Sequence, residues 1–102
     1  MSAQTTVEIG SFITRTPGVK GRRPCLAGTG VTVHRVAGWY KQGSSPEEIA
    51  DQFGHLSLAQ VHAALAYYHA NREEVEALLE AEQREHDRLA LEFPRAIPPS
   101  RP

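Results

Sequence analysis

The sequence predicts a mainly α-helical protein, in which a short N-terminal β-hairpin precedes a three-helix helix-turn-helix bundle and a C-terminal amphipathic helix. Two observations carry this prediction. Glycine and proline cluster around short apolar runs between Pro17 and Val33, a pattern typical of a hairpin. Two later segments each begin with a serine that is followed three residues on by Glu48 or Gln60, which is the sequence of a capping box.

The N-terminal third favours short extended pieces. Residues 1–8 show no hydrophobic period and are predicted to be a flexible N-terminus. Residues 9–14 hold three large apolar side chains and are expected to form a weak strand. Residues 25–27 and 31–33 are expected to be extended on either side of a glycine-rich turn. Because an isolated hairpin is marginal in water, this one must pack on helices or on a second subunit.

Three helices follow the hairpin. Apolar residues recur at helical spacing from Val33 to Gln42, where Gly43 stops the first helix. The second helix is expected between the Ser45 cap and Gly54. The third begins after Ser57 and either stops near Asn71 or continues. Hairpin and bundle together make a domain of residues 9–71.

Residues 72–93 are predicted to be a separate amphipathic helix that binds a partner. Its apolar stripe weakens where the heptad places Glu82 and His86, so this helix is poorly fastened on its own. Four prolines among residues 94–102 then predict a disordered tail. The residues predicted to contact the partner are Val75, Leu78, Leu79, Glu82, His86, Leu89 and Phe93.

Charge divides the chain into two parts. Residues 1–45 carry six basic side chains and one acidic one, whereas residues 46–102 carry five arginines and eleven carboxylates. A basic front attracts phosphate backbones, and the first turns of the second helix of a helix-turn-helix face the major groove. The DNA-contacting residues on this interpretation are Arg22, Arg23, Arg35, Ser57, Gln60 and His62. The alternative is that both charged parts are solvated faces that attract each other within a dimer.

No catalytic or metal-binding set stands out. The single cysteine, Cys25, excludes an internal disulfide and cysteine-rich zinc sites. His55, His62 and His69 recur every seven residues, but no carboxylate or thiolate completes a ligand set at metal-binding spacing. We therefore expect no enzyme activity, no metal and no cofactor. No apolar run approaches the roughly 20 residues of a membrane span and no export signal is visible, so a cytoplasmic protein is expected.

Many positions carry a resemblance to a known family. They are Pro17-Gly18-Val19, Gly21, Pro24-Cys25, Gly28-Thr29, Gly43-x-Ser45-Pro46-Glu47-Glu48-Ile49, His55-Leu56 and Ala63-Ala64-Leu65-Ala66-Tyr67. With these residues the chain resembles the antitoxins catalogued as domain of unknown function 433, small proteins commonly encoded beside a toxin of the PIN-like ribonuclease class. The chain departs from the family at Gly30, where arginine is usual, at Arg22-Arg23 and at Gly54.

The resemblance implies an antitoxin of a type II toxin-antitoxin system, of the VapB-like kind. Such a protein would neutralise its ribonuclease toxin by direct binding and would bind its own promoter DNA as a homodimer. Two other interpretations stay open. One is a stand-alone helix-turn-helix DNA-binding regulator, and the other is a dimerisation module that binds no nucleic acid.

Overall fold

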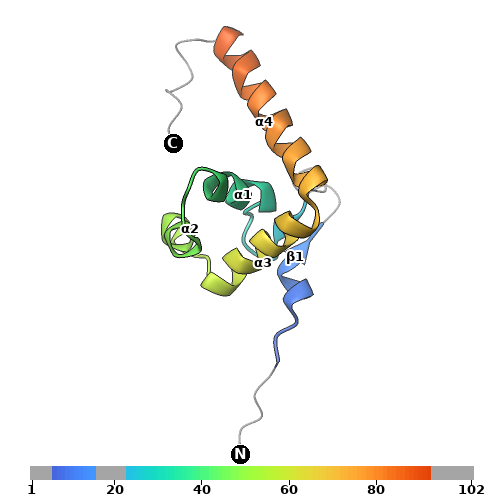
Figure 1. Cartoon of the computed structure of the whole chain (residues 1–102), viewed down its shortest axis with the longest axis vertical. Helices are drawn as coiled ribbons and strands as arrows, with labels where there is room; N and C mark the ends of the chain where they lie inside the picture. The colour runs from blue at the N-terminus through green and yellow to red at the C-terminus, as the bar shows by residue number, and fades with distance from the viewer. Residues whose placement is uncertain (1–5, 16–22, 93–102) are drawn as a thin grey trace, which may run out of the picture.

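The computed structural model describes residues 6–15 and 23–92. Within these ranges the chain is mainly helical and carries one short antiparallel hairpin near its N-terminus, as predicted (Figure 1). In chain order the elements are the 3-10 turn η1 (Ile9–Phe12), the strands β1 (Ile13–Thr14) and β2 (Cys25–Leu26), and the helices α1 (Val33–Lys41), α2 (Pro46–Phe53), α3 (Leu58–Ala70) and α4 (Arg72–Glu92). Arg22, Phe93, the predicted tail and most of the predicted flexible N-terminus lie outside the described residues.

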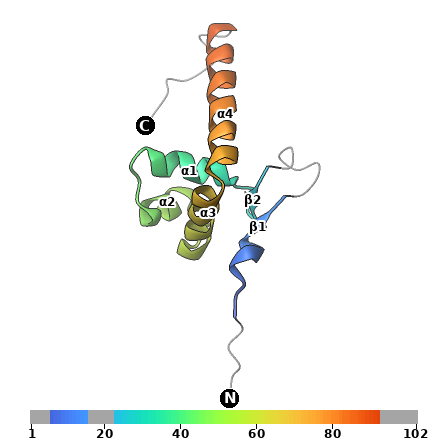
Figure 2. The ribbon, with the colours of Figure 1, turned by 45° about the vertical axis from the view of Figure 1, so that its right-hand side comes forward.

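The hairpin is shorter than predicted at both of its ends. β1 pairs with β2 through Ile13 opposite Leu26 and Thr14 opposite Cys25. The expected strand over residues 9–14 begins instead as η1, since Ser11 N–H donates to the carbonyl of Glu8. Figure 2 shows the hairpin on the side of the body away from α2.

The segment 31–33 contributes a single bridge rather than a strand. Thr32 pairs with Cys25 there, and Val33 already belongs to α1. The cause is a helix cap that the sequence prediction missed, because the Thr32 hydroxyl accepts a hydrogen bond from the Arg35 backbone N–H at 3.3 Å.

The two serine caps form as predicted. Ser45 and Glu48 make a reciprocal capping box at the start of α2, and Ser57 and Gln60 make one at the start of α3. Gly54 ends α2 with φ of +76°, a left-handed conformation that costs a residue with a Cβ about 1–2 kcal/mol. These local signals set the lengths of α2 and α3, and tertiary packing then sets their angle.

The core lies where α1, α2 and α3 meet, and the first turn of α4 completes it. The described core residues are Leu26, Val31, Val33, Val36, Ala37, Ile49, Leu56, Val61, Ala64, Leu65, Tyr68 and Val75. Val75, a predicted partner contact, has no exposed surface in the protomer. Its side chain is already buried against its own protomer.

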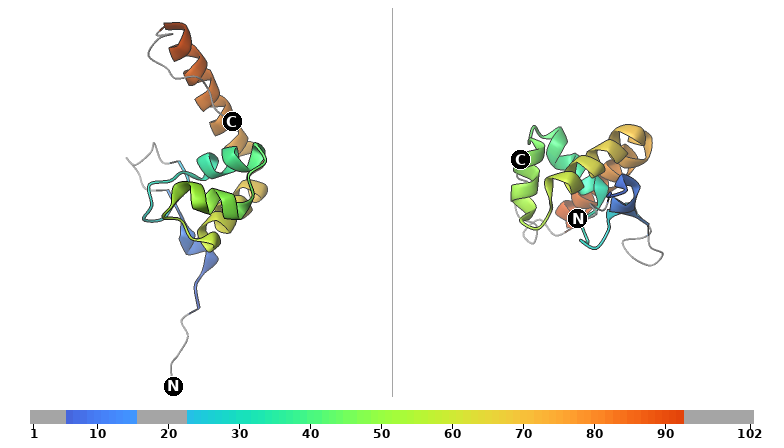
Figure 3. Two further views of the ribbon diagram at one scale, coloured as in Figure 1. Left: turned by 90° about the vertical axis from the view of Figure 1, so that its left-hand side faces the viewer. Right: turned by 90° about the horizontal axis from the view of Figure 1, so that it is seen from below.

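Helix α3 stops at Asn71, one of the two alternatives that the sequence left open. Asn71 has φ of −135° and ψ of 48°, which breaks the helical path before α4 begins. After its first turns α4 leaves the body and projects away from the three-helix bundle (Figures 1 and 3). Among the described residues no helix has both the length and the apolar character to span a bilayer.

Candidate partner-binding groove between α1 and α4

Two tyrosine networks fix the direction in which α4 leaves the body. In the first, the Tyr67 hydroxyl donates to Glu74 Oε1 at 2.6 Å. Arg15, which follows β1, binds the same carboxylate at 2.6 Å and also contacts the Tyr67 hydroxyl. Burial, together with the hydrogen bond to Glu74, raises the pKa of Tyr67. The network thus ties α3, α4 and the hairpin together.

The second network joins α3, α4 and the end of α1. Lys41 Nζ donates to Glu76 Oε1 at 2.7 Å, and the Tyr68 hydroxyl donates to Glu76 Oε2 at 2.6 Å. These hydrogen bonds, that from Lys41 first, lower the pKa of Glu76. Tyr67 and Tyr68 are consecutive, so they leave α3 in different directions and hold α4 from two sides.

Beyond these networks α4 crosses α1 at a glycine. A Cβ placed on Gly38 would lie 3.5 Å from Leu79 Cδ2, which is ordinary van der Waals contact. Leu79 thus packs at Gly38 with room for a methyl group, and the two helices separate toward the far end of α4 (Figure 1). Between them lies a groove of about 410 Å³.

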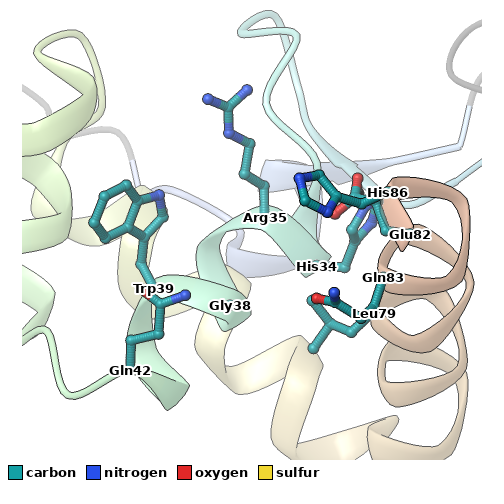
Figure 4. A pocket seen from close by; sticks show the side chains of 9 residues that line it. All are labelled: His34, Arg35, Gly38, Trp39, Gln42, Leu79, Glu82, Gln83 and His86. Atoms are coloured by element: carbon teal, nitrogen blue, oxygen red, sulfur yellow. Dashed lines mark hydrogen bonds and ion pairs between the residues drawn. The ribbon is translucent and has the colours of Figure 1, made fainter. Parts of the chain in front are cut away.

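The groove is lined from both helices (Figure 4). Its lining residues are His34, Arg35, Gly38, Trp39, Gln42, Leu79, Glu82, Gln83 and His86. His34 is 2% exposed, and its Nε2 lies 3.1 Å from Glu82 Oε2. His34 Nδ1 has no partner, and therefore we place the proton on Nε2, which donates to Glu82.

The exposed side of the groove combines one aromatic ring with polar side chains. The Arg35 guanidinium lies 5.4 Å from the centre of the Phe53 ring, a cation–π distance. Trp39 of α1 and His86 of α4 also line the groove, and both side chains are half-buried. The lining therefore mixes the apolar surfaces of Trp39 and Leu79 with polar side chains, a combination that protein interfaces commonly use.

Among the described residues, no hydrogen bond or ion pair joins α4 to another element beyond Glu82. Glu82 makes the last hydrogen bond from α4 to another element. After it, the ion pairs and side-chain hydrogen bonds of the described part of α4 are internal, such as Arg88 with Glu85 and with Glu92. Exposed pairs of this kind stabilise a helix only weakly, because water and salt screen them.

The predicted partner contacts therefore separate into groups. Leu79, Glu82 and His86 come together in the groove. Leu78 and Leu89 are half-buried on α4, and Leu89 lies beyond the groove.

The described residues among the predicted DNA contacts come from three places: Arg23 precedes β2, Arg35 belongs to α1, and Ser57, Gln60 and His62 lie at the start of α3 or within it. Arg35 lines the groove with the predicted partner contacts. Ser57 and Gln60 are occupied by each other: Gln60 Oε1 accepts from the Ser57 N–H at 2.7 Å, and Ser57 Oγ accepts from the Gln60 N–H at 3.1 Å. Bidentate recognition of adenine needs both ends of a glutamine amide, so in this conformation Gln60 cannot supply it. Arg23 and His62 are exposed.

Sequence reasoning missed five lining residues, namely His34, Gly38, Trp39, Gln42 and Gln83. One signal was present. His34, Gly38 and Gln42 recur every four residues and so share a face of α1. A glycine inside a helix costs about 0.5–1 kcal/mol relative to alanine, so Gly38 draws attention to this face. Among the described residues, no group of three or more His, Cys, Asp or Glu side chains is placed to hold a metal ion.

Comparisons with known proteins point to one family. The model of the family described as "Protein of unknown function (DUF433)" matches residues 13–68. A search of curated proteins found no match. Among solved structures, the chain is similar to a DUF433 member protein from Anabaena variabilis ATCC 29413, with 26% identity, 69% of each chain covered and a TM-score of 0.64.

Proposed function

The chain belongs to the DUF433 family, and we propose that it is an antitoxin that neutralises a PIN-like ribonuclease by direct binding through α4 and the α1–α4 groove. The observation that carries the proposal is the unfastened half of α4, which projects from the bundle (Figure 1). A helix stretch this short is marginal in water without packing. A partner that packs against it would supply the missing contacts.

Charge supports a basic partner. Helix α4 contains eight carboxylates and three arginines. An enzyme that cleaves RNA has a basic surface around its substrate path, and complementary potentials speed association and select the partner. The acidic helix would therefore cover the surface that otherwise receives RNA.

Shape adds a place for an anchor. The groove offers the apolar surfaces of Trp39 and Leu79 to one side chain of the partner, and a buried anchor of this kind dominates the affinity of many interfaces. Leu89 continues the same stripe of α4 beyond the groove. Promoter binding is not part of the proposal, because the side chains of Ser57 and Gln60 form the hydrogen bonds of the α3 capping box.

The test uses the full chain and the purified ribonuclease encoded beside it. We expect the chain to inhibit cleavage of an RNA substrate, and L89E to bind the ribonuclease at least about tenfold more weakly, since it places a charge in the apolar contact. The matched control is L91E. Leu91 is 85% exposed and lies about 200° around α4 from Leu89, so L91E should inhibit like the wild type.

Two results would count against the proposal. One is a ribonuclease that neither binds the full chain nor is inhibited by it. The other is equal binding by L89E and L91E, which would remove the stripe of α4 from the interface. Calorimetric titration gives the affinities, and circular dichroism shows whether each variant keeps its helices.

A further inference from the structure

Helix α3 is predominantly apolar, yet one of its faces lies at the surface. None of its residues from Leu58 to Ala70 is Asp, Glu, Lys or Arg. Helices of this composition are normally covered on every side. In the protomer, one face of α3 packs on the core through Val61, Leu65 and Tyr68. The opposite face is exposed and consists of Leu58, Ala59, His62, Ala66, His69 and Ala70.

Of the five large apolar side chains that the described protomer exposes, four lie on or near this helix. These are Val7, Ile9, Tyr40 and Leu58, and the fifth is Leu91 of α4. Leu58, 42% exposed, opens α3 itself. Tyr40 of α1 packs edge-on against His69 of α3 at 5.6 Å between ring centres. Ile9 belongs to η1, which packs against α3, and Val7 comes two residues before it.

Apolar surface that gathers in this way marks a protein interface. In the part of the chain that the structure describes, only Leu91 among these side chains lies far from α3, on the projecting part of α4 (Figure 1).

We propose that this α3 face, defined by the six exposed α3 residues, is the interface through which two copies of the chain form a homodimer. In a twofold dimer each patch meets its own copy, so a charged patch meets like charges. The α3 face has no Asp, Glu, Lys or Arg side chain and so brings none of these charges against its copy, whereas acidic α4 would. Homodimer interfaces are also richer in apolar surface than other interfaces.

The other kinds of partner fit this face less well. A nucleic acid needs cations to replace its counterions, and α3 offers no lysine or arginine. The basic ribonuclease of the proposed function is matched by the carboxylates of α4. The N-terminal end of α3 lies at the end of the body opposite the projecting part of α4 (Figures 1 and 3). A dimer built on α3 therefore leaves α4 of each copy accessible.

The test is the mass of the full chain in solution, by sedimentation over a range of concentrations. The wild type is expected to have the mass of two chains. In A66E two like charges enter the interface, and the dimer should weaken by about a hundredfold or more. The matched control is A77E, the same substitution at an exposed position of α4, which should sediment like the wild type. If A66E loses its helical circular dichroism, A59E on the same face replaces it.

Several results would overturn the proposal. They are a wild-type chain that is monomeric at every concentration, a dimer unchanged in A66E, and a dimer equally weakened in A77E. A wild-type monomer whose binding to the ribonuclease, or to duplex DNA, is lost in A66E would assign the face to that partner instead. Because sedimentation uses the chain alone, its result does not depend on the proposed function.

Discussion

Substitution of Val75 tests whether the start of α4 belongs to the body of the protein. Val75 has no exposed surface and contacts the common core. V75A removes two methyl groups, worth roughly 1.6 kcal/mol of transfer free energy at about 0.8 kcal/mol each. The cavity left behind adds to this loss, and the higher helix propensity of alanine offsets about 0.5 kcal/mol. We expect a net loss of about 2 kcal/mol, or roughly 8–16 °C in Tm for a domain of this size.

The control lies in the same helix. L91A removes more carbon from a side chain that is 85% exposed, and substitutions at such sites stay within about 0.5 kcal/mol. Both variants are compared with the wild type by thermal and urea unfolding, followed by circular dichroism. Equal effects of V75A and L91A would refute the docking of α4 on the core, since a free helix would respond to alanine in the same way at both positions.

Three further predictions follow from the caps, the glycines and the Glu76 network. S45A and S57A should each lower the free energy of unfolding by about 1 kcal/mol, and the double variant by the sum, because the boxes lie in separate helices; a loss much below the sum in urea unfolding would show that the caps are coupled. G54A should lower stability by about 1 kcal/mol because φ is +76°, whereas G38A should raise it by about 0.5 kcal/mol because its Cβ would only touch Leu79; the same sign for both shifts in Tm would contradict this. The pKa of Glu76 in the folded protein lies below its ordinary 4.5. The ionised carboxylate therefore stabilises the fold at pH values above 4.5, and this stabilisation disappears as the pH falls through the folded pKa. The stability difference between wild type and E76Q should therefore shrink between pH 7 and about pH 3, and a difference independent of pH would be evidence against the network.

Local signals predicted the helices well because the caps act within a few residues. Ser45 with Glu48, and Ser57 with Gln60, set the starts of α2 and α3 without help from the rest of the fold. The strands were predicted less well. A threonine such as Thr32 is compatible with a strand or with a helix cap. In the structure it bridges to Cys25 and also caps α1 through the Arg35 backbone N–H, which ends the extended segment.

The groove could be predicted only in part, because it depends on how α1 meets α4. The heptad stripe placed Leu79, Glu82 and His86 on one face of α4. No local pattern shows that Arg35, from the basic residues 1–45, lines the groove with them. Nor does one show that Val75 is buried in the core. The tyrosine networks that set the angle join residues as far apart as Arg15 and Glu74, and such contacts leave no periodic trace in the sequence.

The most direct test of this account is amide hydrogen exchange along α4, measured by mass spectrometry with and without the ribonuclease. In the free chain we expect residues 74–82 to exchange as slowly as the core and residues 84–92 to exchange much faster, because local opening follows the number of buried contacts. Added ribonuclease should slow exchange in residues 84–92. Uniform protection of α4 in the free chain, or fast exchange in residues 84–92 that the ribonuclease leaves unchanged, would contradict the account.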